Sequence, residues 1–177
     1  TSTTASSYDE FMRHLYQGGV AGLVEVHRAY SSDVAATWNR PIGFLWIDGD
    51  HSYQGAKSDF DSFSRHLLPG SLVAFHDALH EFAGPIRVFV EDVLRSDRFG
   101  AGGFVRSIAW CQFRPKDGEA FRPIRRSLAR AAQRLIPFVE DERPLRGLRK
   151  AAYKLHRARV PRSLPSPSQL AALLNRD

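Results

Sequence analysis

Two short apolar runs, each followed directly by polar side chains, dominate the pattern of this sequence. Residues 42–47 are apolar over the length of a strand and lead into residues 48–51, Asp-Gly-Asp-His. Residues 71–75 form a second apolar run, which leads into His76 and Asp77. Near-continuous apolar runs of this length, separated by an amphipathic helix, favour parallel strands buried on both faces.

The segment between the two runs has the spacing of a helix. Its apolar residues Ala56, Phe60, Phe63 and Leu67 recur at intervals of four, three and four, and Pro69-Gly70 ends the pattern. In parallel sheets ligands bind outside the carboxyl ends of the strands. Neighbouring strands lie about 4.8 Å apart, so we expect the polar residues after both runs to share one small site.

The rest of the first two thirds of the chain alternates in the same way. Gly and Pro residues divide the predicted elements, and the order is α-β-α-β-α-β-α-β, which is typical of the α/β class. Trp46, in the middle of the first run, is expected to be a core residue. Besides the elements above, we predict a helix over 8–16, a short strand over 23–26, a short helix capped by Ser31 or Ser32 and ending at Trp38, a helix over 85–94, and one or two strands over 104–113.

Composition places the chain among ordinary globular proteins. It has 177 residues, of which 43% are hydrophobic, enough for one domain with a core and an appendage. No stretch approaches the ~20 consecutive apolar residues of a membrane span, and the first residues do not resemble a signal peptide. The single cysteine, Cys111, excludes an internal disulfide and fits a reducing compartment. We therefore expect a cytoplasmic protein.

Charge divides the chain into two regions. Residues 1–121 carry 11 Lys and Arg against 15 Asp and Glu, whereas residues 122–162 carry 13 against 3. The basic region has two amphipathic helical patterns, over 121–138 and 145–157, and a Pro/Ser-rich stretch precedes a last short helix. The sequence thus predicts an α/β domain over 1–118 and a basic helical extension over 119–177.

Several partners remain open for the basic helices. The simplest interpretation is that their apolar stripes pack on the domain and their charged faces are solvated. Arg and Lys beside a Leu stripe also suit the surface of an anionic membrane, which would make the protein membrane-associated. A phosphate-bearing substrate or nucleic acid is a weaker candidate, because few aromatic residues alternate with the arginines.

Four segments together resemble the class I S-adenosylmethionine-dependent methyltransferases. They are residues 44–53, Phe-Leu-Trp-Ile-Asp-Gly-Asp-His-Ser-Tyr, then Asp59-Phe60, Leu68-Pro69-Gly70, and residues 73–77, Val-Ala-Phe-His-Asp. The most similar group carries an Ile-Asp-Gly-Asp-His-Ser-Tyr signature and often acts on sugars or natural products. The resemblance spans about residues 8–114. It implies a Rossmann-like, doubly wound, mostly parallel sheet.

The pattern is also similar to that of the metal-dependent catechol-type O-methyltransferases, which hold Mg²⁺ between the ends of two strands. The resemblance implies Asp48, His76 and Asp77 as metal ligands. His51 matches the position of that family's general base, so the resemblance implies His51 and Asp48 as the catalytic pair. Histidine at position 76, where those enzymes have a carboxylate, suits hard Mg²⁺ less well than oxygen and favours Mn²⁺, Zn²⁺ or no metal.

The cofactor site that the resemblance implies is partial. The segment Tyr30-Ser31-Ser32, followed by Asp33, resembles the family's adenine-contacting segment, so Tyr30, Ser31, Ser32 and Asp48 are the expected S-adenosylmethionine contacts. The family's Gly-rich turn after the first strand and the acidic residue after the second are not found here. We therefore expect a methyltransferase fold that is incomplete at its N-terminal side.

These observations favour an S-adenosylmethionine-dependent O-methyltransferase, metal-assisted through Mg²⁺ or Mn²⁺, acting on a hydroxyl of a sugar, glycolipid or secondary metabolite. Two other functions stay open. One is a metal-dependent hydrolase that uses the Asp/His cluster to activate water. The other is a non-catalytic, methyltransferase-like scaffold whose basic tail binds a membrane or a partner. A homo-oligomer is compatible with each of the three.

Overall fold

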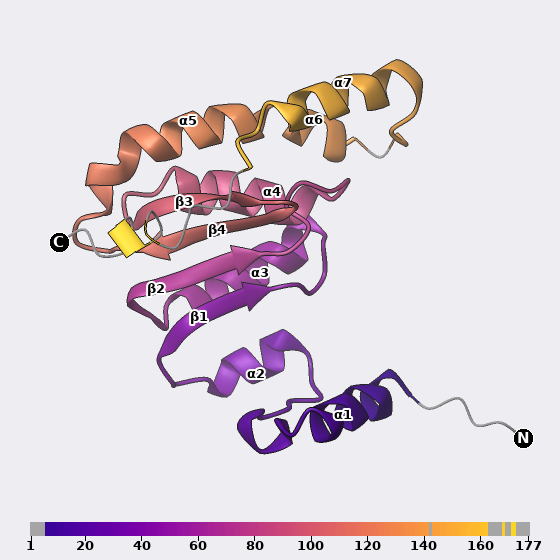
Figure 1. Ribbon diagram of the computed structural model, residues 1–177, viewed down its shortest axis with the longest axis vertical. Helices are drawn as coiled ribbons and strands as arrows, with labels where there is room; N and C mark the ends of the chain where they lie inside the picture. Colours follow the sequence, from indigo (N-terminus) through magenta and orange to yellow (C-terminus); the bar gives the residue numbers. More distant parts are fainter. Residues whose placement is uncertain (1–5, 142, 163–167, 169–170, 173–177) are drawn as a thin grey trace, which may run out of the picture.

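The computed structural model describes residues 6–141, 143–162, 168 and 171–172 (Figure 1). The polypeptide alternates between helices and strands in its first two thirds and is helical afterwards, which confirms the α/β class. The elements are α1 (Ser7–Gln17), η1 (Ala21–Leu23), α2 (Ser31–Thr37), β1 (Ile42–Ile47), α3 (Tyr53–Ser64), β2 (Leu67–Phe75), α4 (Ala83–Val88), η2 (Phe89–Leu94, π-helical), β3 (Phe99–Val105), β4 (Ile108–Phe113), η3 (Gly118–Phe121), α5 (Arg122–Gln133), α6 (Ile136–Val139) and α7 (Gly147–Ala158).

Within the described residues the strands form a sheet of order β1-β2-β4-β3. β1 pairs in parallel with β2, and β4 runs antiparallel to both of its neighbours, β2 and β3. β1, β2 and β3 therefore point the same way, and β4 is inserted between the second and third of them. The sheet is mostly parallel in direction and is consistent with the Rossmann-like methyltransferase type that the sequence predicts.

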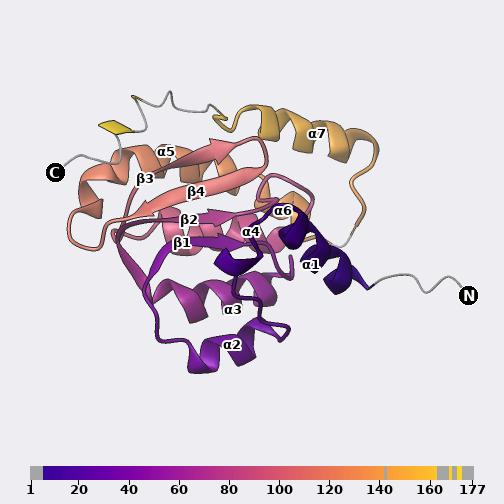
Figure 2. The same ribbon diagram turned by 60° about the horizontal axis from the view of Figure 1, so that its bottom comes forward.

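One face of this sheet is covered by helices. Side chains alternate along each strand, and the set that includes Leu45, Ile47, Val73 and Phe75 belongs to the hydrophobic core. The rings of Phe60 in α3 and Phe89 in η2 pack against Phe75 at centroid distances of 5.7 and 5.9 Å. In Figure 1, α3 and α4 lie behind the sheet, and in Figure 2 α3 lies below it, so both views place α3 on the same side.

The opposite face presents aromatic side chains to solvent, so the prediction that these strands are buried on both faces was wrong for β1. Phe44 is 57% exposed and Trp46 is 43% exposed. The strand register places Trp46, Ala74 and Trp110 side by side across β1, β2 and β4. The prediction that Trp46 is a core residue was wrong, because strand periodicity gives the side of a residue but not whether a second layer covers that side.

The predicted strand over residues 23–26 is not formed. Its first residue ends the 3₁₀ turn η1, and Val24 has extended backbone angles without belonging to a strand. A strand needs a neighbour to satisfy its backbone hydrogen bonds, and the described neighbour of β1 is β2 on one side only. The second predicted strand, in contrast, begins earlier than expected, at Leu67, a residue that the apolar spacing assigns to the preceding helix.

The basic helices share the core of the α/β region. α5 packs against β3 and η2, and Leu128 and Ala132 are buried there. The sequence pattern predicts an apolar face of Ile124, Leu128, Ala131 and Leu135, but Ile124 is 43% exposed, while Arg125 is fully buried. Its guanidinium donates to the carbonyl oxygens of Leu94, Phe99 and Gly118 and pairs with Asp97. The burial pattern of α5 is therefore rotated relative to the predicted apolar face.

Beyond α5 the predicted helix over 121–138 is interrupted, since α5 ends at Gln133 and α6 begins at Ile136. α7 buries Tyr153 and leaves Leu148 90% exposed.

No helix among the described residues has the length and apolar character to cross a bilayer. The boundary at residue 118 stays a prediction, and most of the Pro/Ser-rich stretch and of the last short helix lies outside the described residues.

Candidate functional site

The carboxyl ends of β1 and β2 bring four predicted site residues together. The Asp48 Oδ1 atom lies 3.0 Å from His76 Nδ1 and 3.8 Å from His51 Nε2. Asp77 Oδ1 lies 3.4 Å from His76 Nδ1, and Asp77 Oδ2 lies 3.8 Å from His51 Nε2. The expectation that these side chains lie close together holds in the structure. We refer to Asp48, His51, His76 and Asp77 as the Asp/His cluster.

Backbone contacts fix the two loops that carry the cluster. The His76 N–H donates to the carbonyl of Ile47 at 3.0 Å, which extends the pairing of β1 and β2 by one residue. The Gly84 N–H donates to the carbonyl of His51 at 3.0 Å. A Cβ atom at Gly84 would lie 2.2 Å from the Ser52 carbonyl oxygen, so only glycine permits this close approach.

Asp50 and Ser52 serve the local fold of the loop. The Asp50 carboxylate accepts from the Ser52 N–H at 2.9 Å and from its hydroxyl at 2.7 Å. These hydrogen bonds lower the pKa of Asp50. Ser52 in turn is the N-cap of α3, and its hydroxyl accepts from the Gly55 N–H at 3.0 Å. Asp50 therefore organises the start of α3 through Ser52.

Asp77 has an unusual backbone conformation, with φ of 54°. Positive φ is uncommon for a residue with a side chain and costs of order 1 kcal/mol or more. The turn that follows is held by α7, because the Tyr153 hydroxyl donates to the carbonyls of Leu79 and His80 at 3.0 and 2.7 Å. The strain at Asp77 is thus maintained by packing, which is the pattern found where a side chain must point into a site.

Two aromatic residues support the cluster, and sequence reasoning did not assign them this role. The Trp46 indole N–H donates to Asp48 Oδ2 at 3.4 Å, and its ring lies 5.6 Å from that of His76. The Phe82 ring lies 4.6 Å from the ring of His51. For Trp46 a signal existed, because residues two apart in a strand share one face, so its indole and the Asp48 side chain were expected on the same side.

Residues 2–78 match a family model described as a methyltransferase domain. The match supports a class I methyltransferase family, and residues 2–78 are called the methyltransferase domain. The match ends one residue after Asp77, so it contains the whole Asp/His cluster, whereas β3, β4 and the basic helices follow it. Enzymes with such a domain transfer methyl groups and in general take them from S-adenosylmethionine.

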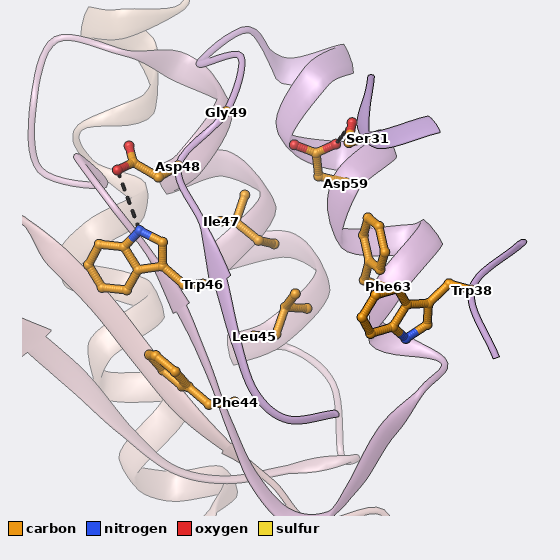
Figure 3. A pocket seen from close by; sticks show the side chains of 10 residues that line it. All are labelled: Ser31, Trp38, Phe44, Leu45, Trp46, Ile47, Asp48, Gly49, Asp59 and Phe63. Atoms are coloured by element: carbon orange, nitrogen blue, oxygen red, sulfur yellow. Dashed lines mark hydrogen bonds between the residues drawn. The ribbon is translucent and has the colours of Figure 1, made fainter. Parts of the chain in front are cut away.

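The methyltransferase domain has a hollow of about 480 Å³ beside the edge of β1 that pairs with no strand of the described residues. Figure 3 shows Phe44 and Trp46 on one side of β1, and Leu45 and Ile47 on the other, toward α3. The volume lies within the roughly 300–1,000 Å³ of small-molecule pockets. Asp48 lines the hollow at the end of the strand. The hollow and the Asp/His cluster therefore meet at Asp48.

Of the four predicted cofactor contacts, two line the hollow and two do not. Ser31 lines the hollow, and its hydroxyl donates to Asp59 Oδ1 at 2.5 Å (Figure 3). Ser31 is the first residue of α2, and neither it nor Ser32 is the N-cap, which is Tyr30. Tyr30 is 82% exposed, and neither Tyr30 nor Ser32 is among the lining residues. Ser31 and Asp48 are the predicted contacts that border this space.

The cluster also has donor atoms suited to a metal ion. His51 Nε2 and His76 Nδ1 are buried atoms without a hydrogen-bond partner among the described residues. His76 Nδ1 lies 3.0 Å from Asp48 Oδ1, yet the two atoms do not form a hydrogen bond. Buried polar atoms are normally paired, so each unpaired atom requires an explanation such as a bound ion. One donor atom each from Asp48, His51 and His76 lies within 4.8 Å of the others.

Proposed function

We propose that the chain is an S-adenosylmethionine-dependent O-methyltransferase that methylates a hydroxyl group of a sugar, a glycolipid or a secondary metabolite. One observation carries the proposal: within a methyltransferase domain, the carboxyl ends of β1 and β2 hold an Asp/His cluster, and its member Asp48 lines a hollow of about 480 Å³. A hydroxyl group must be deprotonated or strongly polarised before it can accept a methyl group. The histidines and carboxylates of the Asp/His cluster are groups that can do this.

The chemistry that the site must support is an in-line displacement. The acceptor oxygen forms a bond to the methyl carbon while the sulfur–carbon bond of the donor breaks and its electron pair stays on sulfur, which yields S-adenosylhomocysteine. The hydroxyl proton passes to the protein or to water. Histidine is the residue that most often accepts such a proton, and the resemblance implies His51. Asp48 and Asp77, whose oxygens both lie 3.8 Å from His51 Nε2, would stabilise the protonated ring.

A divalent ion offers a second way to assist the same step. When bound, such an ion lowers the pKa of a hydroxyl that coordinates to it. The unpaired nitrogens of His51 and His76 and the adjacent Asp48 oxygen fit this requirement. The Trp46 indole N–H, which binds Asp48 Oδ2, would keep Asp48 Oδ1 directed at the histidines.

A calorimetric titration with S-adenosylhomocysteine tests the proposed cofactor directly. We expect micromolar binding, and we expect Asp48→Asn to weaken it because Asp48 lies where the hollow meets the cluster. Asp61→Asn is the matched control, since Asp61 pairs with Lys57 on the surface of α3. The absence of heat with the unchanged chain would contradict the proposed cofactor.

Turnover is then measured as S-adenosylhomocysteine release with a panel of sugar, glycolipid and phenolic hydroxyl acceptors. We expect His51→Ala to reduce turnover by at least about 100-fold, the lower range for a general base. Hydrolysis of a phosphate ester by the metal-loaded chain, without S-adenosylmethionine and abolished by Asp48→Asn, would instead support a metal-dependent hydrolase.

A further inference from the structure

We infer that His51 is a metal ligand, and that Asp48, His51 and His76 form a three-residue site for a late first-row divalent ion such as Zn²⁺ or Co²⁺. This set differs from the resemblance-based set, in which Asp77 is the third ligand and His51 acts as a base. With Nε2 bound to the ion, His51 would not accept the hydroxyl proton, and the ion itself would lower the pKa of the hydroxyl. The inference concerns metal binding alone and does not depend on methyl transfer.

The distances within the set are those of ligands around one ion. Two ligands about 2.1 Å from a metal at a tetrahedral angle lie roughly 3.4 Å apart. Asp48 Oδ1 is 3.0 Å from His76 Nδ1 and 3.8 Å from His51 Nε2, and the three donor atoms all lie within 4.8 Å of one another. A displacement of less than about 1 Å would bring them to common bonding distance of one centre.

The unpaired nitrogens are the second observation. His51 Nε2 and His76 Nδ1 are both buried and both lack a hydrogen-bond partner in the described part of the chain. Leaving a buried polar atom unpaired destabilises the folded state, because the atom loses its hydration without gaining a partner. An ion bound between these nitrogens and Asp48 would give each nitrogen a bonding partner. A single proton would give a partner to one of the two rings only.

Asp77 has a different geometry. Its two oxygens are directed at different histidines, with Oδ1 3.4 Å from His76 Nδ1 and Oδ2 3.8 Å from His51 Nε2. Oδ1 is also 3.8 Å from His80 Nε2. His76 Nδ1 and His51 Nε2 are the nitrogens that would bind the ion, so Asp77 does not hold either ring through a hydrogen bond there, and its carboxylate adds negative charge beside the ion. The donor atoms that lie within 4.8 Å of one another among the described residues come from Asp48, His51 and His76, so we assign Asp77 to the surroundings of the ion and not to its ligands.

The donor set determines the class of metal. Two imidazoles and one carboxylate are typical of catalytic zinc sites, which keep a position open for water or substrate, and of non-haem iron sites. Mg²⁺ prefers oxygen ligands and keeps most of its water. A site of this composition should therefore select ions with affinity for nitrogen, and it leaves room for an acceptor hydroxyl.

Cobalt is the probe that distinguishes the two ligand sets. Co²⁺ added to the chain should give visible absorption bands, and paramagnetically shifted proton NMR should show two exchangeable imidazole N–H signals, one from each bound ring. We expect His51→Gln to remove one signal and weaken Co²⁺ binding at least about 100-fold. Asp77→Asn should keep both signals and lose no more than the roughly 10–100-fold of an outer partner.

His80→Gln is the matched control, because His80 lies near Asp77 but outside the set. A single N–H signal in the unchanged chain would overturn the inference, and this measurement requires no variant to fold. Loss of binding in Asp77→Asn with unchanged binding in His51→Gln would restore the resemblance-based set. Failure to bind Co²⁺ or Zn²⁺ at all would also overturn the inference, whereas the S-adenosylhomocysteine titration without metal tests the proposed function separately.

Discussion

The two faces of the sheet bury apolar surface very differently, although they belong to the same strands. On the helix-covered face Val73 and Phe75 are completely buried, whereas on the open face Phe44 and Trp46 are about half exposed. Apolar burial contributes roughly 25 cal/mol per Å², so the covered face supplies most of the stability. The open face instead supplies Trp46, which contacts both Asp48 and His76 of the Asp/His cluster.

This difference separates residues that hold the fold from residues that serve the site. Both sets are large, apolar and close together in the sequence, so their identity alone does not distinguish them. Substitutions that are matched in chemistry but placed on opposite faces do distinguish them.

The largest contrast is between Phe75→Ala and Phe44→Ala. Phe75 packs between Phe60 and Phe89, so its truncation leaves a cavity and should lower the free energy of unfolding by about 3–5 kcal/mol. Phe44 is 57% exposed, and the same change should cost less than about 1 kcal/mol. Urea denaturation of both variants measures the difference. Equal losses would show that the open face is covered in solution.

Arg125→Met tests how α5 is held against β3, at the edge of the helix-covered face. The substitution keeps the buried volume but leaves carbonyl groups of Leu94 and Gly118 without their donor, and it should cost about 3 kcal/mol. Arg126→Met, on the exposed side of α5, is the control and should stay within about 0.5 kcal/mol. An equal effect of both substitutions would mean that α5 is not docked through Arg125.

Cys111 makes the covered face sensitive to alkaline pH. Burial raises the pKa of its thiol from 9.0 to about 12. The folded state disfavours the thiolate, so the stability linked to this group is fully present below pH 9.0 and is lost as the pH rises through about 12. The free energy of unfolding should therefore fall in this window.

Cys111→Ala should remove that part of the pH dependence, at a small cost in stability at neutral pH. Tyr153, whose pKa burial raises from 10.0 to about 12, accounts for part of the remaining slope. Urea melts at a series of pH values check both statements. Rapid alkylation of Cys111 at neutral pH in the folded chain would contradict its burial.

Sequence reasoning succeeded where one run of residues contains the whole signal. The apolar runs identify β1 and β2, and the rule that ligands bind at the carboxyl ends of parallel strands brings Asp48 and His76 together. It failed where the outcome depends on distant parts of the chain. Residues 23–26 have strand composition, but no strand of the described residues pairs with them, and Arg125 is buried because three carbonyl groups of other segments converge on it.

Trp46→Phe should affect the site and leave the fold nearly unchanged. It keeps the ring beside His76 but removes the N–H that Asp48 Oδ2 accepts, so we expect about a 10-fold loss of Co²⁺ affinity. The change in the free energy of unfolding should stay below about 1 kcal/mol. Trp110→Phe, two strands away on the same face, is the control. Equal metal affinity in both variants would remove the supporting role of Trp46.

The smallest effect on stability is expected at a second open apolar surface, on α7. Leu148 and Leu155 are 90% and 53% exposed, and two turns of helix place them on one side. Lys150 and Lys154 are exposed on the same helix.

If this surface binds anionic membranes, the chain should associate with phosphatidylserine vesicles and dissociate at high salt. Leu148→Ser should weaken association several-fold while changing stability by less than about 0.5 kcal/mol. Unchanged association of the serine variant would assign the attraction to the basic residues alone, and no association at low salt would leave α7 with a solvated face.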